Sequence, residues 1–169
     1  MAEPIGVVVC GATGRMGSET VQAVARDAGT RLVGVVTRRG GTLTVGGITV
    51  PGAPTLPALI DSVHPRCVVD FTTSEVALDH GRIALSRGLA FVTGTTGLSQ
   101  AALDELRRLA EQQGVGCVVA PNFAIGAVLA GHFAAIAARH FAWAEVIELH
   151  HEQKADAPSG TALATARAM

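Results

Sequence analysis

Residues 5–17, IGVVVCGATGRMG, decide the fold of this chain. The segment Ile5–Cys10 is a continuous run of mostly apolar, β-branched residues, which is typical of a strand buried on both faces of a parallel sheet. Glycines then occupy every third position: Gly11, Gly14 and Gly17. Residues 15–28 have the pattern of a helix, so the segment predicts a strand, a tight turn and a helix N-terminus in direct succession.

The three glycines have separate roles in such a turn. The first permits the tight turn, the second lets backbone approach a pyrophosphate, and the third lets the helix pack closely against the strand. The helix N-terminus adds N–H groups and a positive dipole. Because the spacing is GxxGxxG instead of GxGxxG, the turn predicts dinucleotide binding but leaves the cofactor open, with a plain tight turn as the alternative.

Strand-like and helix-like segments alternate as far as residue 120. The further predicted strands are residues 31–36, 66–70, 90–93 and 115–120. The further predicted helices are residues 56–63, 74–87 and 99–113, with Ser74 and Ser99 as N-caps. Residues 38–54 are rich in glycine, threonine and proline, and they predict a loop with a short hairpin. We therefore predict an α/β fold with a Rossmann-type doubly wound parallel sheet.

The pattern changes after residue 121. Residues 124–140 predict a helix that is apolar on nearly every face, which we expect to be buried between layers or subunits. Residues 145–150 predict a strand, and a further helix begins at Thr161. We assign residues 1–121 to a dinucleotide-binding domain and residues 122–169 to the beginning of a second, α+β domain for substrate binding and oligomerisation.

Composition narrows the classes of partner. The chain is 49% hydrophobic and only 16% charged, which predicts surface that another subunit or segment covers. A net charge of −1 gives no support to nucleic-acid binding. The apolar stretch 123–137 is interrupted by His132 and is shorter than the roughly 18 residues of a membrane span, so we expect no membrane partner.

The cysteines indicate the compartment. Cys10, Cys67 and Cys117 lie far apart without a CxxC pair, and each falls in a predicted strand. This spread predicts reduced, buried thiols. Because the N-terminus also lacks the basic region and cleavage site of a signal peptide, we expect a soluble, cytoplasmic protein.

The end of the second predicted strand indicates the cofactor. An Asp or Glu at this point binds the adenosine ribose hydroxyls of NAD. Here the strand is followed by Thr37, Arg38 and Arg39. Arginines bind a 2′-phosphate through charge-assisted, forked hydrogen bonds. We therefore expect NADPH or NADH with NADPH favoured, and the alternative is a solvated loop with two exposed charges.

Two hydroxyl-rich turns follow the third and fourth predicted strands. They are residues 70–73, DFTT, and residues 94–97, GTTG. Ligands of open α/β sheets bind at the carboxyl ends of the strands. These turns can therefore bind ribose and the nicotinamide carboxamide, or they are simply turns.

Residues 148–161, ELHHEQKADAPSGT, are the densest polar cluster. His150, His151 and Lys154 bring proton donors to a strand end, which suits general acid catalysis. Adjacent histidines in a strand point to opposite faces and no third ligand is evident, so we expect no metal site. Residues 158–161 open a helix whose N–H groups and hydroxyls can bind a carboxylate. The alternative is a polar loop before a capped helix. The other histidines are expected to be structural: His64, His80, His132 and His140.

Together these motifs resemble those of the dihydrodipicolinate reductase family. The matching segments are GATGRMG at 11–17, VVDFTT at 68–73, VTGTTGLS at 92–99, APNFAIGAVL at 120–129 and ELHHEQKADAPSGTA at 148–162. They occur in family order over essentially the whole chain. The last segment is the most specific, because the family shows HHxxKxDAPSGT there.

The resemblance implies NAD(P)H-dependent reduction of 4-hydroxy-tetrahydrodipicolinate to tetrahydrodipicolinate, in lysine and diaminopimelate biosynthesis, by a homotetramer. It implies that His150 and Lys154 are catalytic. Binding of the dicarboxylate substrate is implied for His151, Ser159, Gly160 and Thr161. The turns, the strand ends and the resemblance together assign nucleotide contacts to Gly11, Gly14, Arg15, Met16, Gly17, Arg38, Phe71, Gly94, Thr95, Thr96, Ala120, Asn122 and Phe123. Many family members have an acid where this chain has Thr37, which argues against a strong NADH preference.

Family members also continue well beyond the position that matches Met169. The second domain is therefore expected to be incomplete, in a fragment or in a naturally short protein. Two alternatives stay open. One is a reductase of a related cyclic imine in specialised metabolism, and the other is a truncated nucleotide-binding protein without turnover.

Overall fold

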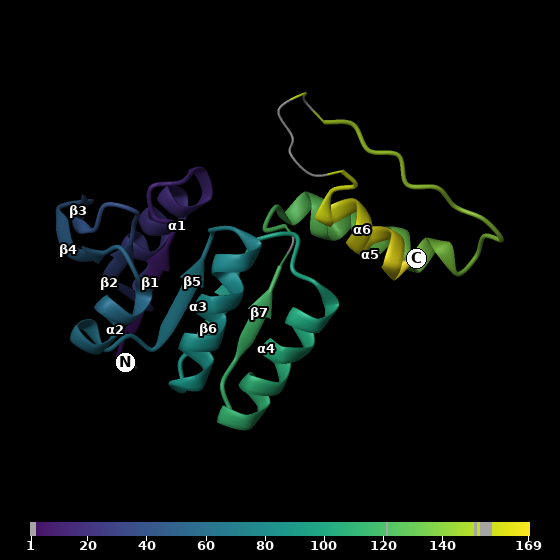
Figure 1. Cartoon of the computed structure of the whole chain (residues 1–169). Coiled ribbons are helices and arrows are strands. Elements are labelled where there is room, and N and C mark those ends of the chain that lie inside the picture. The colour runs from purple at the N-terminus through teal and green to yellow at the C-terminus, as the bar shows by residue number, and fades with distance from the viewer. Residues whose placement is uncertain (1–2, 121, 151, 153–156) are drawn as a thin grey trace. The chain divides into compact units, whose positions relative to one another are not determined.

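The computed structural model describes residues 3–120, 122–150, 152 and 157–169. The chain forms two compact units, Met1–Val119 and Ala120–Met169. The first unit is a layered α/β structure, and the described part of the second unit contains two helices (Figure 1).

A seven-stranded sheet forms the centre of the first unit, in the order β3-β4-β2-β1-β5-β6-β7. Its strands are β1 (Ile5–Cys10), β2 (Thr30–Val36), β3 (Gly41–Val45), β4 (Ile48–Ala53), β5 (Cys67–Asp70), β6 (Ala90–Thr93) and β7 (Cys117–Val119). All neighbouring strands are parallel except β3 and β4. The order reverses at β1, with β2 on one side and β5 on the other. The predicted Rossmann-type, doubly wound sheet is thus confirmed.

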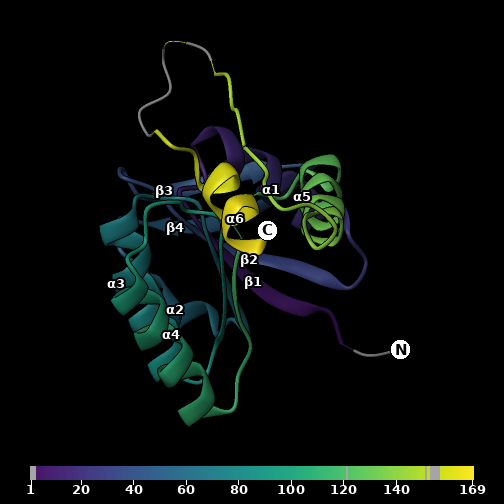
Figure 2. The ribbon, with the colours of Figure 1, turned by 90° about the vertical axis from the view of Figure 1, so that its right-hand side faces the viewer.

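Helices cover both faces of this sheet. They are α1 (Arg15–Arg26), α2 (Leu56–Val63), α3 (Ser74–Ser86) and α4 (Gln100–Gln113). Val7 and Val9 of β1 join the hydrophobic cluster that includes Val21 of α1. Val8 and Cys10 belong to the larger cluster formed with α2, α3 and α4. Figure 2 shows these three helices together on one side of the sheet. The central strand is therefore buried on both faces, as its unbroken apolar sequence predicts.

The predicted hairpin within residues 38–54 is confirmed, and it extends the sheet. β3 and β4 pair in antiparallel fashion around Gly46 and Gly47, which both have positive φ, at 54° and 82°. Such a two-residue turn suits the right-handed twist of hairpin strands. β4 also pairs in parallel with the end of β2, so the sheet is wider than the five strands expected from the sequence.

The two predicted N-caps have different outcomes. Ser99 caps α4, and its hydroxyl accepts a hydrogen bond from the Ala102 N–H at 3.2 Å. The prediction for Ser74 is wrong, because Ser74 is the first helical residue of α3 and the extended Thr73 holds the N-cap position. A capping side chain must lie on the residue before the first helical turn.

The described part of the second unit departs from expectation in two ways. α5 (Ile125–Ala138) and α6 (Gly160–Ala168) pack together, but no residue of α5 is buried within this chain, so burial between layers is not seen and burial between subunits stays a prediction. Residues 145–150 form no strand. A strand needs a neighbouring backbone for its N–H and C=O groups, and the described residues of this unit offer none. Among the described residues, no helix has the length and apolarity needed to cross a membrane.

Candidate nucleotide-binding site

The glycine turn after β1 is held by backbone contacts that exclude larger residues. Gly11 has φ +74°, and a Cβ on it would lie 2.5 Å from the Phe71 carbonyl oxygen. A Cβ on Gly17 would lie 2.0 Å from the Gly11 carbonyl oxygen, inside van der Waals contact. The Gly14 N–H closes the turn by donating to the Gly11 carbonyl at 2.9 Å. The first turn of α1 can approach β1 this closely only because these positions lack side chains.

A cavity of about 590 Å³ opens beside this turn, which is a volume typical of small-molecule sites. The carboxyl-terminal ends of four parallel strands contribute to it, those of β1, β2, β4 and β5. Its walls are Gly11, Thr13, Gly14, Val36, Thr37, Arg38, Pro54, Phe71, Thr72, Thr73, Val76 and His80. Gly11, Arg38 and Phe71, which belong to three separate sequence motifs, therefore line one cavity.

Arg38 forms one wall of this cavity, and it is exposed. It makes no hydrogen bond or ion pair within the described part of the chain, so its guanidinium is available to a ligand. The neighbouring Arg39 is also exposed but does not line the cavity. The two arginines of the predicted 2′-phosphate site therefore differ, and Arg38 is the one placed to bind a ligand.

Other predicted nucleotide contacts are not among the residues that line this cavity. Arg15, Met16 and Gly17 form the first turn of α1, where the Met16 side chain is 46% exposed. Gly94, Thr95 and Thr96 follow β6. The remaining three predicted contacts belong to the second unit: Ala120, Asn122 and Phe123.

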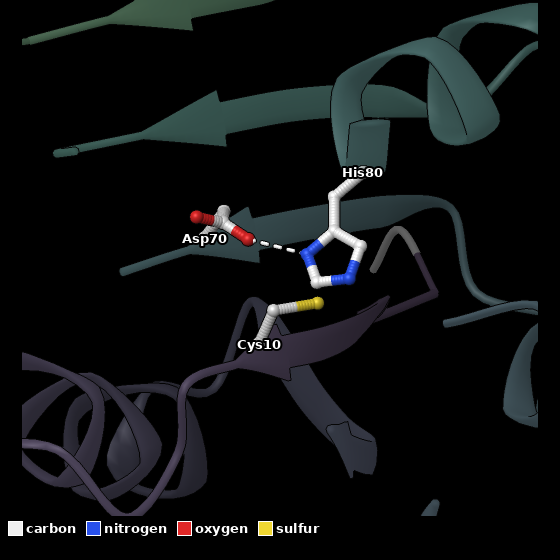
Figure 3. A group of neighbouring side chains, drawn as sticks. All are labelled: Cys10, Asp70 and His80. Atoms are coloured by element: carbon white, nitrogen blue, oxygen red, sulfur yellow. Dashed lines mark hydrogen bonds and ion pairs between the residues drawn. The ribbon is translucent and has the colours of Figure 1, made fainter. Parts of the chain in front are cut away.

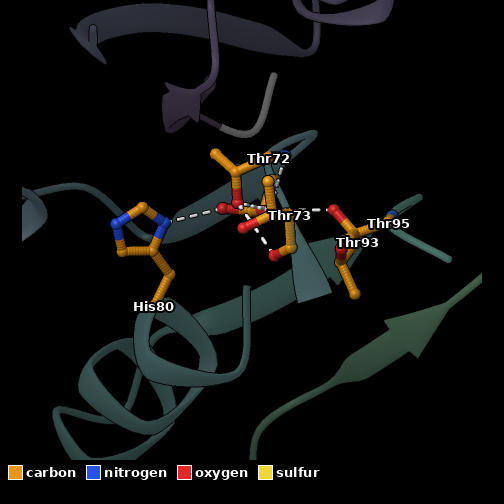
Figure 4. Close-up of polar contacts among 6 residues, drawn as sticks. Thr72, Thr73, His80, Thr93 and Thr95 are labelled. Carbon is orange, nitrogen blue, oxygen red and sulfur yellow. Dashed lines mark hydrogen bonds and ion pairs between the residues drawn. The ribbon is translucent and has the colours of Figure 1, made fainter. Parts of the chain in front are cut away.

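A buried polar network centred on Asp70 was not predicted from the sequence. Its carboxylate is fully buried and accepts hydrogen bonds from the Thr72 N–H at 3.0 Å and the Thr72 hydroxyl at 2.8 Å. The Thr95 hydroxyl donates to the same oxygen at 3.1 Å, and His80 Nδ1 bonds the other oxygen at 2.7 Å (Figure 4). A signal was present in the sequence, because an acid ends the otherwise apolar strand β5. His80, which the sequence predicts to be structural, bonds Asp70 and also lines the cavity, and its partner could not be inferred from local sequence.

Cys10 lies beside this pair, and the donor atoms of Cys10, Asp70 and His80 are within 4.8 Å of one another (Figure 3). Burial, and then the nearby Asp70 carboxylate, raise the pKa of the Cys10 thiol well above its usual value. The thiolate needed for metal binding is thus disfavoured, and Asp70 already accepts four hydrogen bonds. The chemistry of the group suits a hydrogen-bonded core and not a cation site.

In the second unit, the N-terminus of α6 binds a carboxylate of the chain itself. The Ser159 N–H donates to Glu148 Oε1 at 2.7 Å, and the Ser159 hydroxyl accepts from the Ala162 N–H at 3.1 Å. His150 Nδ1 lies 3.5 Å from Glu148 Oε2. Among the predicted substrate-binding residues, Ser159 caps α6, and Gly160 and Thr161 are its first two residues.

Asn122 connects two further segments of this unit. Its side-chain amide donates to the Thr161 hydroxyl at 3.0 Å, and its carbonyl oxygen accepts from the Ala124 N–H at 2.7 Å. The predicted catalytic Lys154 and the predicted substrate ligand His151 lie outside the described residues.

Comparison with known proteins gives consistent matches along the chain. The family model "Dihydrodipicolinate reductase, N-terminus" matches residues 5–123, and "Dihydrodipicolinate reductase, C-terminus" matches residues 126–169. The 4-hydroxy-tetrahydrodipicolinate reductase of Moorella thermoacetica is 47% identical over 100% of this chain and 66% of its own length. That of Listeria monocytogenes serotype 4b is 43% identical over 96% of this chain and 64% of its own length.

Solved structures agree. The dipicolinate-bound dihydrodipicolinate reductase from Paenisporosarcina sp. TG-14 has a TM-score of 0.81 at 38% identity, over 98% of this chain and 65% of that protein. D-galactose-1-dehydrogenase from Rhizobium etli has a TM-score of 0.65 at 22% identity over 80% of this chain and 43% of that protein, which shows a shared fold alone. The chain spans slightly less than two thirds of the length of the curated relatives it matches. On sequence and structure together, the chain belongs to the dihydrodipicolinate reductase family.

Proposed function

We propose that this chain carries the nucleotide-binding half of an NAD(P)H-dependent reductase that converts 4-hydroxy-tetrahydrodipicolinate to tetrahydrodipicolinate in lysine and diaminopimelate biosynthesis. One observation carries the proposal. The glycine turn of a family member opens onto a cavity of about 590 Å³ that Arg38 and Phe71 also line. The relatives are named 4-hydroxy-tetrahydrodipicolinate reductase, and we infer the proposed substrate from that name.

The residues present fit a dinucleotide. Gly11 and Gly14 line the cavity with backbone alone beside the N-terminus of α1, whose N–H groups and dipole favour an anion such as a pyrophosphate. On either side, Arg38 follows β2 and Phe71 follows β5, so an extended ligand can cross the strand ends where the order reverses. The bound cofactor supplies the hydride. The protein's role is to hold the cofactor in place and to exclude water from the site.

The proposal favours NADPH over NADH. The supporting observation is that the Arg38 guanidinium lines the cavity without a partner among the described residues, while Thr37 stands where an acid would bind a ribose diol. An arginine gains from a 2′-phosphate a charge-assisted contact that a ribose hydroxyl cannot give.

For the substrate we propose that His150 and Lys154 deliver the proton that must accompany hydride transfer to an imine. We assign the two substrate carboxylates to His151, Ser159, Gly160 and Thr161. The hydrogen bond from the Ser159 N–H to the Glu148 carboxylate supports this assignment, because it is the kind of contact that a substrate carboxylate would make there.

We also propose that the protein is a cytoplasmic homo-oligomer, a tetramer by analogy with the family. The exposed apolar side chains of α5 support association with further copies of the chain. They include Ile125, 77% exposed, and Phe133, 61% exposed. A soluble monomer seldom leaves such a stripe uncovered.

A second candidate, nucleotide binding without turnover, is favoured by the second unit, where no residue of α5 or α6 is buried. An NADPH-oxidation assay with freshly prepared 4-hydroxy-tetrahydrodipicolinate separates the two. Substrate-dependent oxidation supports the reductase. Saturable NADPH binding without oxidation supports the second candidate, and the absence of both contradicts the proposed function.

A further inference from the structure

The Asp70 carboxylate joins three elements of the first unit. Thr72 belongs to the turn after β5, Thr95 to the loop after β6, and His80 to the second turn of α3. All three bond the carboxylate through their side chains, at 2.8, 3.1 and 2.7 Å (Figure 4). The backbone reinforces the link, because the Gly94 N–H donates to the Asp70 carbonyl oxygen at 3.1 Å. One buried group therefore sets the relative positions of both hydroxyl-rich turns.

Such a group is not what a stable core requires. A fully buried carboxylate is retained only when hydrogen bonds replace its hydration, and an apolar residue would fill the same space without that demand. What the network does provide is a single geometry, since its acceptor oxygens hold the two turns at hydrogen-bonding distance.

These turns lie on the side of the site where the nicotinamide half of the cofactor would be bound, an inference that rests on the proposed function. Arg38, at the end of β2, marks the adenosine side, and the glycine turn after β1 marks the pyrophosphate. Continuing across the sheet leads to β5 and β6. Thr72, Thr73 and His80 line the cavity on that side, whereas the Asp70 side chain is wholly covered.

We propose that Asp70, held by His80, is a positioning residue for the nicotinamide half of the cofactor. It contacts neither cofactor nor substrate, and it acts by fixing the turns at Thr72 and Thr95 that border the nicotinamide. Hydride transfer is sensitive to such positioning, because a displacement of about 1 Å can cost about a hundredfold in rate. The adenosine half, bound beyond β1, does not depend on the network.

Paired substitutions of the whole chain test this proposal. Asp70→Leu removes both acceptor oxygens with a side chain of similar size. Asp70→Asn keeps one carbonyl oxygen that can accept from the threonines. Its amide N–H can donate to His80 Nδ1 when the imidazole is in its other tautomer. Thr95→Val is a milder change that removes a single donor. Its matched control is Thr30→Val, because the Thr30 hydroxyl donates to the Val24 carbonyl at 2.9 Å at the opposite end of the sheet.

Two probes are titrated by calorimetry, NADPH and adenosine 2′,5′-bisphosphate, which represents the adenosine half alone. We expect Asp70→Leu and Thr95→Val to weaken NADPH binding by about tenfold, the scale of a lost charged hydrogen bond, and to change the affinity for the bisphosphate by less than about twofold. The fluorescence of bound reduced nicotinamide should change in the same variants. Asp70→Asn and Thr30→Val should resemble the wild type in every reading.

Two results would overturn the proposal. One is an equal loss of affinity for both probes in Thr95→Val, which would mean a general loss of structure. The other is unchanged NADPH binding and nicotinamide fluorescence in folded Asp70→Leu or Thr95→Val, which would leave the network a purely structural role. A folded wild-type chain that binds neither probe would instead contradict the proposed function on which the inference rests, and so the two failures are distinguishable.

Discussion

Arg38 is the residue on which cofactor choice should depend. It lines the cavity, whereas Arg39, with the same charge and also exposed, does not. We expect Arg38→Ala to weaken NADPH binding by about 1.5–3 kcal/mol, the worth of a charged hydrogen bond, and to leave NADH binding nearly unchanged. Arg39→Ala is the matched control and should affect both nucleotides little. Calorimetric titration of the two nucleotides measures this, and a parallel loss of both in Arg38→Ala would refute a 2′-phosphate contact.

We expect Lys154 to contribute to the catalytic step and not to nucleotide binding. In a form of the enzyme that turns over, we expect Lys154→Ala to lower kcat by about 10²–10⁴, the usual contribution of a general acid or base. The dissociation constant of NADPH should stay within about twofold, since the residue is assigned to the substrate half. Steady-state kinetics beside a nucleotide titration test this, and near-normal kcat in the variant would remove Lys154 from the mechanism.

At the scale of elements, the junction of β1 and α1 depends on the absence of a side chain at Gly17. A Cβ there would lie 2.0 Å from the Gly11 carbonyl oxygen, so we expect Gly17→Ala to destabilise the first unit by about 1–3 kcal/mol. Gly126→Ala is the control, because it is also helical and a Cβ there meets nothing within 4 Å. It should be neutral or stabilising by up to about 1 kcal/mol. Thermal unfolding followed by circular dichroism compares the two, and equal melting temperatures would contradict the packing argument.

Elements with local signals were predictable from the sequence, and those that depend on distant partners were not. The apolar run of β1, the glycine turn and the Ser99 cap each carry their cause within a few residues. The bond between Asp70 and His80 joins a strand to a helix, and neither residue type alone indicates it. The expected strand at residues 145–150 failed for a related reason, because apolar sequence does not supply the neighbouring strand that a ladder requires.

For the whole molecule, the apolar stripe of α5 should govern association. Ile125, Leu129, Phe133 and Ile136 recur at helical spacing and are each at least 45% exposed. We expect the wild-type chain to self-associate and Phe133→Glu to shift it toward the monomer, because a charge cannot be buried unpaired in an apolar contact. Ile48→Glu, at an exposed apolar position of β4 in the first unit, is the control. Size-exclusion chromatography with light scattering measures the masses, and a wild-type monomer would contradict this prediction.

The first unit is expected to bind a nicotinamide dinucleotide at the glycine turn. Calorimetric titration of NADPH into the purified chain, beside Gly14→Leu, is the sharpest test, because Gly14 lines the cavity and we expect a bulky residue there to occupy the space that the pyrophosphate needs. We expect saturable binding of one NADPH per chain and at least about tenfold weaker binding by the folded variant, since phosphate contacts to the α1 N-terminus would be lost. Equal affinities in the two proteins, or no saturable binding by the folded wild type, would contradict it.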